Sequence, residues 1–237
     1  MRLSITILAI ASTLMFGCAS PTDSEAPLIT IDLPSPLEMR PGWALQAARS
    51  AARGWTDDGD IHADCKQWFF HDGGGNWAAL RFYSEDKIVL LGNDHEYSNT
   101  YFGSASEYFD EEETDILAGA PDWWSFNLSG YPFEDWIGFI YGWDGERWQR
   151  AAYDVDDGFK GLDLLGWIGL RDTQNTIKHF WRGDPFEPNK LEYIQDALKA
   201  EEKLTAEQFE RLMPGKDTQA ALAAMKKFYE APMGCGS

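Results

Sequence analysis

The clearest structural signal in the chain is residues 136–153, WIGFIYGW-DG-ERWQRAAY. Asp144-Gly145 stands between two aromatic-rich runs, and this dipeptide favours a two-residue type I′ turn. That turn sets a register with the pairs Trp143–Glu146, Tyr141–Trp148 and Phe139–Arg150. Because side chains alternate along a strand, we expect the odd-numbered residues from Ile137 to Trp143 to share one face. The stretch therefore predicts a β-hairpin.

Other strand-like runs precede this hairpin. Residues 66–71 and 77–83 flank the loop DGGGN, which predicts a second hairpin. Residues 87–91 predict a third strand, and residues 97–102 a weaker fourth. Apolar positions at helical spacing begin at residue 172 and continue to 228, with N-cap signals at Asp172, Asn189, Thr205 and Asp217. An earlier helix is predicted to follow Pro41, in its first turn, and to end near Gly54.

Strands followed by helices predict an α+β fold, with an antiparallel sheet and a C-terminal set of helices packed on one face. The chain is 44% apolar and 14% aromatic, which suffices for a sizeable core in a single domain over residues 41–237. Residues 18–40 are rich in proline and polar side chains and predict a tether.

The N-terminus has the pattern of an export signal. Arg2 precedes an apolar run from Ile5 to Phe16, and Gly17 precedes Cys18. The stretch Leu14-Met-Phe-Gly-Cys18 resembles the lipobox of bacterial lipoproteins, in which the Cys is acylated, for example with palmitate, and becomes the first mature residue.

This resemblance implies a signal peptide over residues 1–17 and a lipid anchor on Cys18. Because Ala19 rather than Asp follows the Cys, it also implies an outer-membrane location in the cell envelope, facing the periplasm or the cell surface. Secretion without lipid, with cleavage after Ala19, is the alternative.

Charge narrows the range of partners. The 39 acidic and 20 basic residues give a formal net charge of −19 at pH 7. Such acidity argues against nucleic acid, whose affinity depends on basic residues at phosphates. It also argues against contact of the protein surface with anionic lipid. A basic partner protein is compatible with it, and so is a purely solubilising role.

Two cysteines follow the leader, Cys65 and Cys235. In an oxidising compartment we expect them to form a disulfide; two free thiols are the alternative.

No motif for a cofactor or a metal is evident. His62 and Cys65 lack a second ligand pair, and His71-Asp72 is expected in a hairpin loop rather than in a catalytic pair. The acidic turns at 57–60 and 154–158 lack the spacing of an EF-hand, which leaves an irregular calcium site as a weaker hypothesis. We therefore predict no cofactor.

Two groups of residues are candidate contact sites. One is the acidic run Asp110, Glu111, Glu112 and Glu113, predicted to be a helix or loop; the other is the set Trp123, Trp124, Trp136, Trp143 and Trp148. The favoured hypothesis is a membrane-anchored module that binds a basic partner protein, as an immunity protein binds a toxin. The alternative is a glycan-binding or glycan-hydrolysing envelope enzyme that uses carboxylates beside Trp residues.

Overall fold

A computed structural model describes residues 26–54, 61–126, 128, 136–160 and 190–235. The leader with Cys18, the acidic turn at 57–60, the helix predicted from Asp172 and the cap at Asn189 lie outside the described residues.

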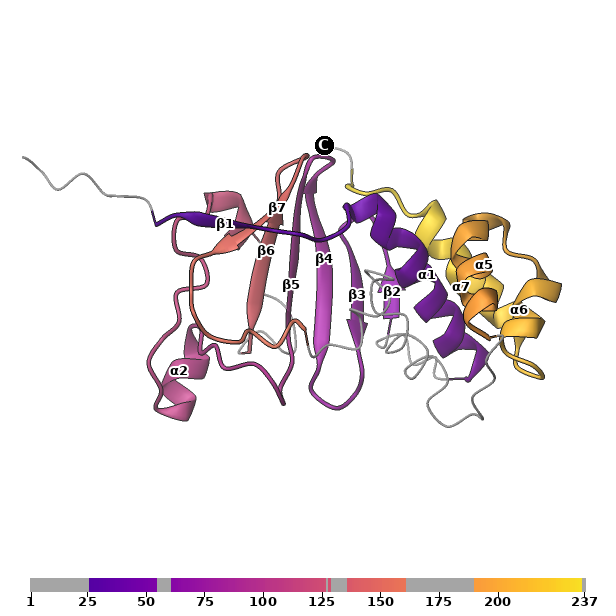
Figure 1. The fold of residues 1–237 in the computed structure, drawn as a ribbon, viewed down its shortest axis with the longest axis horizontal. Coiled ribbons are helices and arrows are strands. Elements are labelled where there is room, and N and C mark those ends of the chain that lie inside the picture. Colours follow the sequence, from indigo (N-terminus) through magenta and orange to yellow (C-terminus); the bar gives the residue numbers. More distant parts are fainter. Residues whose placement is uncertain (1–25, 55–60, 127, 129–135, 161–189, 236–237) are drawn as a thin grey trace, which may run out of the picture.

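The protein has an α+β fold built on a seven-stranded antiparallel sheet, as predicted (Figure 1). The strands are β1 (Leu28–Ile31), β2 (Ile61–Ala63), β3 (Gln67–His71), β4 (Trp77–Ser84), β5 (Lys87–Asn93), β6 (Phe139–Trp143) and β7 (Trp148–Ala151). Their order in the sheet is β1-β7-β6-β5-β4-β3-β2. Strands β2 to β7 thus form a meander, and the N-terminal strand β1 returns to pair with β7.

Four α-helices gather at the β2–β3 end of the sheet (Figure 1). They are α1 (Pro36–Ala52), α5 (Lys190–Ala200), α6 (Ala206–Leu212) and α7 (Thr218–Glu230), with the 3-10 turn η2 (Glu201–Lys203) between α5 and α6. A short helix, α2 (Ser104–Phe109), lies apart from them, and the 3-10 turn η1 (Asp122–Ser125) follows it in the chain.

Both faces of the sheet are buried. Trp68, Leu80 and Tyr141 pack in one core with α1, α5, α6 and α7. Their sequence neighbours on the opposite face pack with Ile116 and Trp124, which belong to the segment that follows β5. This explains the uninterrupted apolar run in β5, because a strand buried on both faces needs no polar alternation.

The register predicted for the β6–β7 hairpin is wrong. Trp143 pairs with Trp148, so the loop has four residues rather than two. The Asp144 carboxylate accepts hydrogen bonds from the backbone N–H groups of Glu146 and Arg147, at 3.0 and 2.9 Å. These bonds stabilise the longer loop. Phe139, Tyr141 and Trp143 do share one face, but Ile137 precedes the strand and joins the opposite core.

The first helix begins earlier than predicted. Ser35 caps it in a capping box with Glu38, so Pro41 lies inside the helix rather than in its first turn. Gly54 follows the C-cap residue Arg53 with a φ of 72°, in accord with the predicted end of the helix near this glycine. Residues 28–31 and 36–40, which we assigned to the tether, therefore belong to β1 and α1.

Most of the remaining local predictions are confirmed. Thr205 forms a capping box with Gln208, and Asp217 caps α7. Cys65 and Cys235 form a disulfide across a separation of 170 residues. The fourth strand predicted at 97–102 is wrong, because within that stretch only Ser98 makes a β-bridge, to Asp157.

Candidate functional site

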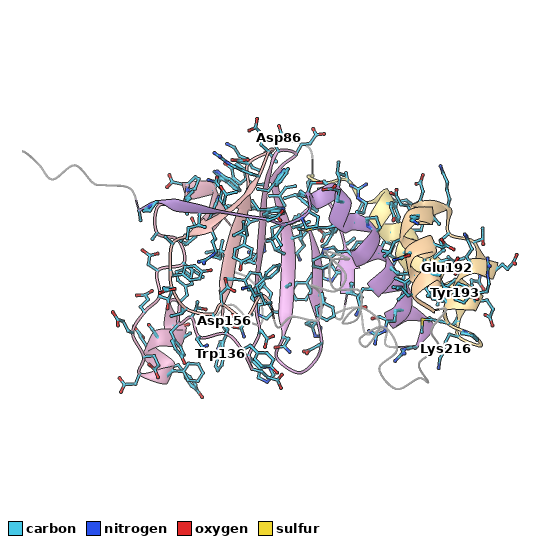
Figure 2. All side chains as sticks on the ribbon, in the orientation of Figure 1. Asp86, Trp136, Asp156, Glu192, Tyr193 and Lys216 are labelled. Carbon is cyan, nitrogen blue, oxygen red and sulfur yellow. A yellow bond between two sulfur atoms is a disulfide. The ribbon has the colours of Figure 1, made fainter. Side chains whose placement is uncertain are left out.

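The candidate site lies at the end of the sheet where β5 ends and β6 begins. The segment after β5 runs from Asp94 through α2 to an acidic loop, and Trp136 stands just before β6. Figure 2 shows Trp136 at this end of the molecule, far from Glu192 on the helical end. The antiparallel topology thus brings residues about 40 positions apart in the sequence onto one surface.

Four aromatic side chains meet there and form what we call the aromatic patch: Tyr101, Tyr108, Phe109 and Trp136. The ring centroid of Trp136 lies 4.7 Å from that of Phe109 and 5.6 Å from that of Tyr108. Tyr101 contacts Phe109 at 5.7 Å. Tyr108 is 74% exposed, Phe109 42% and Trp136 37%. Exposed aromatic side chains in mutual contact are typical of interaction surfaces.

The acidic run Asp110–Glu113 follows the aromatic patch directly. Asp110 caps the C-terminus of α2 with a φ of 55°, which turns the chain, and the Glu111 N–H donates to the carbonyl of Ser106 at 3.0 Å. Glu113 accepts a hydrogen bond from the Gly103 N–H at 3.1 Å. All four side chains are exposed, and none has an ion-pair partner among the described residues. Their charge is therefore not neutralised locally.

A small pocket of about 140 Å³ opens beside the aromatic patch. Tyr101, Phe109, Trp136 and Ile137 supply its apolar walls. Asn93, Asp94, Ser98 and Thr100 supply polar atoms, and His95 also lines it. It is below the size of pockets that hold drug-sized ligands, which start at about 300 Å³. We call it the Asp94 pocket.

Asp94 is the buried carboxylate of this pocket, at 1% exposure. Its Oδ1 accepts the backbone N–H groups of Glu96 and Tyr97, at 3.0 and 3.2 Å. Its Oδ2 has no hydrogen-bond partner among the described residues. Burial raises the pKa of the Asp94 carboxyl, and the two backbone hydrogen bonds oppose this rise.

Further oxygens lie beside Asp94. The hydroxyls of Ser98 and Thr100 are 2.9 Å apart, and the Thr100 hydroxyl donates to the carbonyl of Gly138 at 2.6 Å. A Cβ at Gly138 would stand 2.5 Å from Ser98 Oγ and 3.0 Å from Asn93 Oδ1. Because glycine has no Cβ, Gly138 leaves room for the side chains of Ser98 and Asn93.

A larger pocket, of about 700 Å³, lies near β1 and the end of β7. Tyr141 and Tyr153 both donate to Asp157 Oδ2, at 2.5 and 2.8 Å. Burial, followed by the Asp157 charge, raises the pKa of both phenols well above the ordinary value, so they stay protonated. The Arg150 guanidinium donates to two backbone carbonyls and lies 4.3 Å from the Tyr153 ring centroid. These groups satisfy one another and hold the loop after β7 in place.

The five Trp residues predicted as contacts differ in their exposure. Trp124 and Trp148 are each 1% exposed and lie in opposite cores, so their predicted role in partner contact is wrong. Trp143 is half-buried against Trp148, at 5.5 Å. Trp123 is half-buried beside the exposed Tyr83. Of the five, Trp136 alone lies beside the acidic run.

Sequence reasoning did not identify Asp94, Tyr108 or Phe109 as site residues. Tyr108 and Phe109 directly precede the acidic run, a signal that was available. For Asp94 there was none, because its burial depends on the fold of the following loop.

The other ionisable candidates have structural roles. Asp72 accepts backbone hydrogen bonds within the β3–β4 loop, as expected for a hairpin. Cys65 is in the disulfide and is not available to zinc. Among the residues the structure describes, no group of three or more His, Cys, Asp or Glu is arranged to hold a metal ion.

Comparison of the chain with protein-family models, with curated proteins and with solved structures found no match in any of the three.

Proposed function

We propose that this protein is an envelope lipoprotein that binds a basic segment of a partner protein through the aromatic patch and the acidic run. The observation that supports this most directly is that four exposed carboxylates, without ion-pair partners among the described residues, directly follow the exposed rings of the aromatic patch.

The two halves of the surface suit a Lys- or Arg-rich segment in different ways. The acidic run attracts it over a distance and raises the association rate. The rings of Trp136 and Tyr108 attract a cation at close range and bury the apolar stems of Lys and Arg. A large aromatic residue surrounded by polar groups is also the usual composition of an interface hot spot.

Export to the cell envelope is supported by two features. The leader ends at Cys18 in a lipobox-like stretch, and the Cys65–Cys235 disulfide is typical of oxidising compartments. We propose attachment through acylated Cys18 to the outer membrane, with the domain facing the periplasm or the cell surface. None of the helices in the described residues combines the length and the apolar character that a membrane span requires.

The test compares two variants of equal charge. In the first, Asp110, Glu111, Glu112 and Glu113 become Asn and Gln. In the second, the exposed Glu192, Asp196, Glu202 and Glu207 of the helical end are changed in the same way. Binding of a Lys/Arg-rich protein or peptide is followed by stopped flow at low salt and above ~0.15 M, where screening acts within ~8 Å.

We expect slower association for the first variant and near wild-type rates for the second. The wild-type rate should fall as salt rises. If the association rate falls equally in both variants, the net charge of the protein rather than this surface governs binding. If neither differs from wild type, the acidic run serves only solvation.

The glycan hypothesis is a second candidate, because Trp136 forms a wall of a pocket that contains the buried Asp94. A sugar ring can stack on Trp136 while Asp94 or Asn93 binds its hydroxyls. Hydrolysis would need a second carboxylate at the scissile bond, and among the described residues the Asp94 pocket has one. Calorimetric titration with neutral oligosaccharides tests this candidate, and saturable binding that the change Trp136→Ala abolishes would favour it.

A further inference from the structure

The Asp94 pocket allows a more specific inference, which rests on the proposed function. We propose that this pocket accepts the side-chain ammonium group of one lysine of the basic partner, with Asp94 as its counter-ion.

The proposal rests first on the burial and the hydrogen-bond partners of Asp94. Asp94 is 1% exposed, its Oδ1 accepts two backbone hydrogen bonds, and its Oδ2 accepts none from the described residues. The Oδ2 lone pairs are therefore available to a cation that enters the pocket, and a charge-assisted hydrogen bond in so enclosed a site is stronger than one at an exposed surface. Among the described residues, no Lys or Arg lines the pocket, so this part of the chain does not supply the cation.

The geometry favours lysine over arginine. Arginine binds a carboxylate best with both oxygens, through its planar fork of N–H groups. Oδ1 of Asp94 is already occupied by the N–H groups of Glu96 and Tyr97. The single available oxygen, Oδ2, matches a compact ammonium group better.

The remaining lining complements the rest of a lysine side chain. Asn93, Ser98 and Thr100 provide oxygens that can accept the other ammonium N–H groups. Trp136 and Phe109 provide apolar surface for the methylene stem and ring faces for the cation. The volume of about 140 Å³ suits one side chain rather than a cofactor.

The first experiment needs no variant. The purified protein is titrated with three short, otherwise identical peptides that contain one Lys, one Arg or one norleucine, and the Trp136 indole N–H is followed by NMR. We expect the Lys peptide to bind roughly tenfold tighter than the norleucine peptide, the usual effect of a charge-assisted hydrogen bond. Equal affinity of the two, or a preference for Arg, would overturn the proposal.

The second experiment compares Asp94→Asn with Glu96→Gln. Asn can retain the hydrogen bonds from Glu96 and Tyr97 but lacks the charge. Asp94→Asn should therefore abolish the preference for Lys over norleucine. Glu96→Gln removes one charge from an exposed neighbour and should leave the preference within about twofold, as for a surface charge. A preference that survives Asp94→Asn would overturn the proposal.

Calcium is the third probe, because the pocket oxygens are hard donors. Ca²⁺ alone should not shift the Trp136 signal, and a saturable shift that blocks the Lys peptide would assign the pocket to a metal instead. The outcomes also separate the two proposals. Loss of salt-dependent binding on neutralising the acidic run, together with no Lys preference, supports the docking surface and rejects the lysine pocket. A Lys preference without any effect of the acidic run rejects the docking surface alone.

Discussion

Trp136 and Phe109 meet edge to face, with their ring planes at 80° and their centroids 4.7 Å apart. This contact links the short helix α2 to the start of β6. Trp136 is 37% exposed, whereas Trp124, which also precedes β6 in the sequence, is 1% exposed. The two residues therefore serve different purposes, one at the surface and the other in the core.

We predict that Trp136→Ala lowers the free energy of unfolding by about 1–2 kcal/mol, because it removes the contacts with Phe109 and Tyr108 from a partly exposed site. Trp124→Ala should lower it by about 3–5 kcal/mol, as for other large-to-small changes in a core. Urea titrations of both variants measure the difference. Equal losses would contradict the assignment of Trp136 to the surface.

A second prediction concerns Gly142. A Cβ at this position would lie on the Trp124 ring, closer to it than any van der Waals contact allows. Gly142→Ala should therefore destabilise the protein by about 1–3 kcal/mol, as overpacking does. Gly74→Ala is the control, because its Cβ would meet only the exposed side chain of Asp72, at 3.3 Å. Urea titrations of both variants measure the difference. Comparable urea midpoints would argue against the tight packing of Trp124.

A third prediction concerns the disulfide. It closes a loop of 170 residues, and the chain-entropy model gives a long loop a contribution of up to about 5 kcal/mol. Replacing Cys65 and Cys235 with Ser should lower the free energy of unfolding by about 2–5 kcal/mol. Reductant should destabilise the wild type to a similar extent and leave the double variant unchanged. Full thiol labelling of the native, unreduced protein would refute the bridge.

A fourth prediction follows from the pKa of Asp94, which burial raises in the folded state. A carboxyl with a raised folded pKa contributes stability below the unfolded pKa of about 3.9 and loses it as pH rises through the folded pKa. Relative to Asp94→Asn, the wild type should therefore become less stable as pH rises above about 4. The nearby charges of Glu96 and His95 act on the same group, in opposite directions.

Urea midpoints of the two proteins, measured from pH 4 upward, test this dependence. A constant difference across the range would mean that Asp94 titrates as an exposed carboxyl does. Addition of the Lys peptide should reduce the difference, because a bound cation favours the ionised form.

A fifth prediction concerns Cys18, outside the described residues. If the lipobox-like stretch is used, the wild type should fractionate with membranes and carry acyl mass, and Cys18→Ser should lose both. More than one acyl chain is expected, because a single chain anchors only weakly. A wild type that is released to the aqueous phase without added mass would favour simple secretion.

The features predicted best from the sequence were those that depend on neighbours in the chain. The capping box at Thr205, the N-cap at Asp217 and the β3–β4 hairpin are local, and the structure has them where the sequence placed them. The Asp144-Gly145 turn is also local, but its residues are compatible with either a two-residue or a four-residue loop. The hydrogen bonds that Asp144 accepts from Glu146 and Arg147 favour the longer one, which moves the register by two residues.

The site was less predictable, because exposure depends on what covers each face of the sheet. Trp123 and Trp124 are adjacent in the sequence, but only Trp124 is fully buried in the core against the sheet, whereas Trp123 is half-buried at the edge of that core. Asp94 is likewise buried by the loop that leaves β5 and returns to pair Ser98 with Asp157. Neither relationship leaves a periodic signal in the sequence.

The pairing of β1 with β7 has a mechanical consequence. Any pull on the chain that precedes residue 28 enters the fold through β1, which runs along the edge of the sheet. Its four paired residues hold β7 by hydrogen bonds perpendicular to the strand. A force along β1 loads these bonds together rather than one after another. The β1–β7 pairing can therefore resist tension before it reaches the rest of the domain.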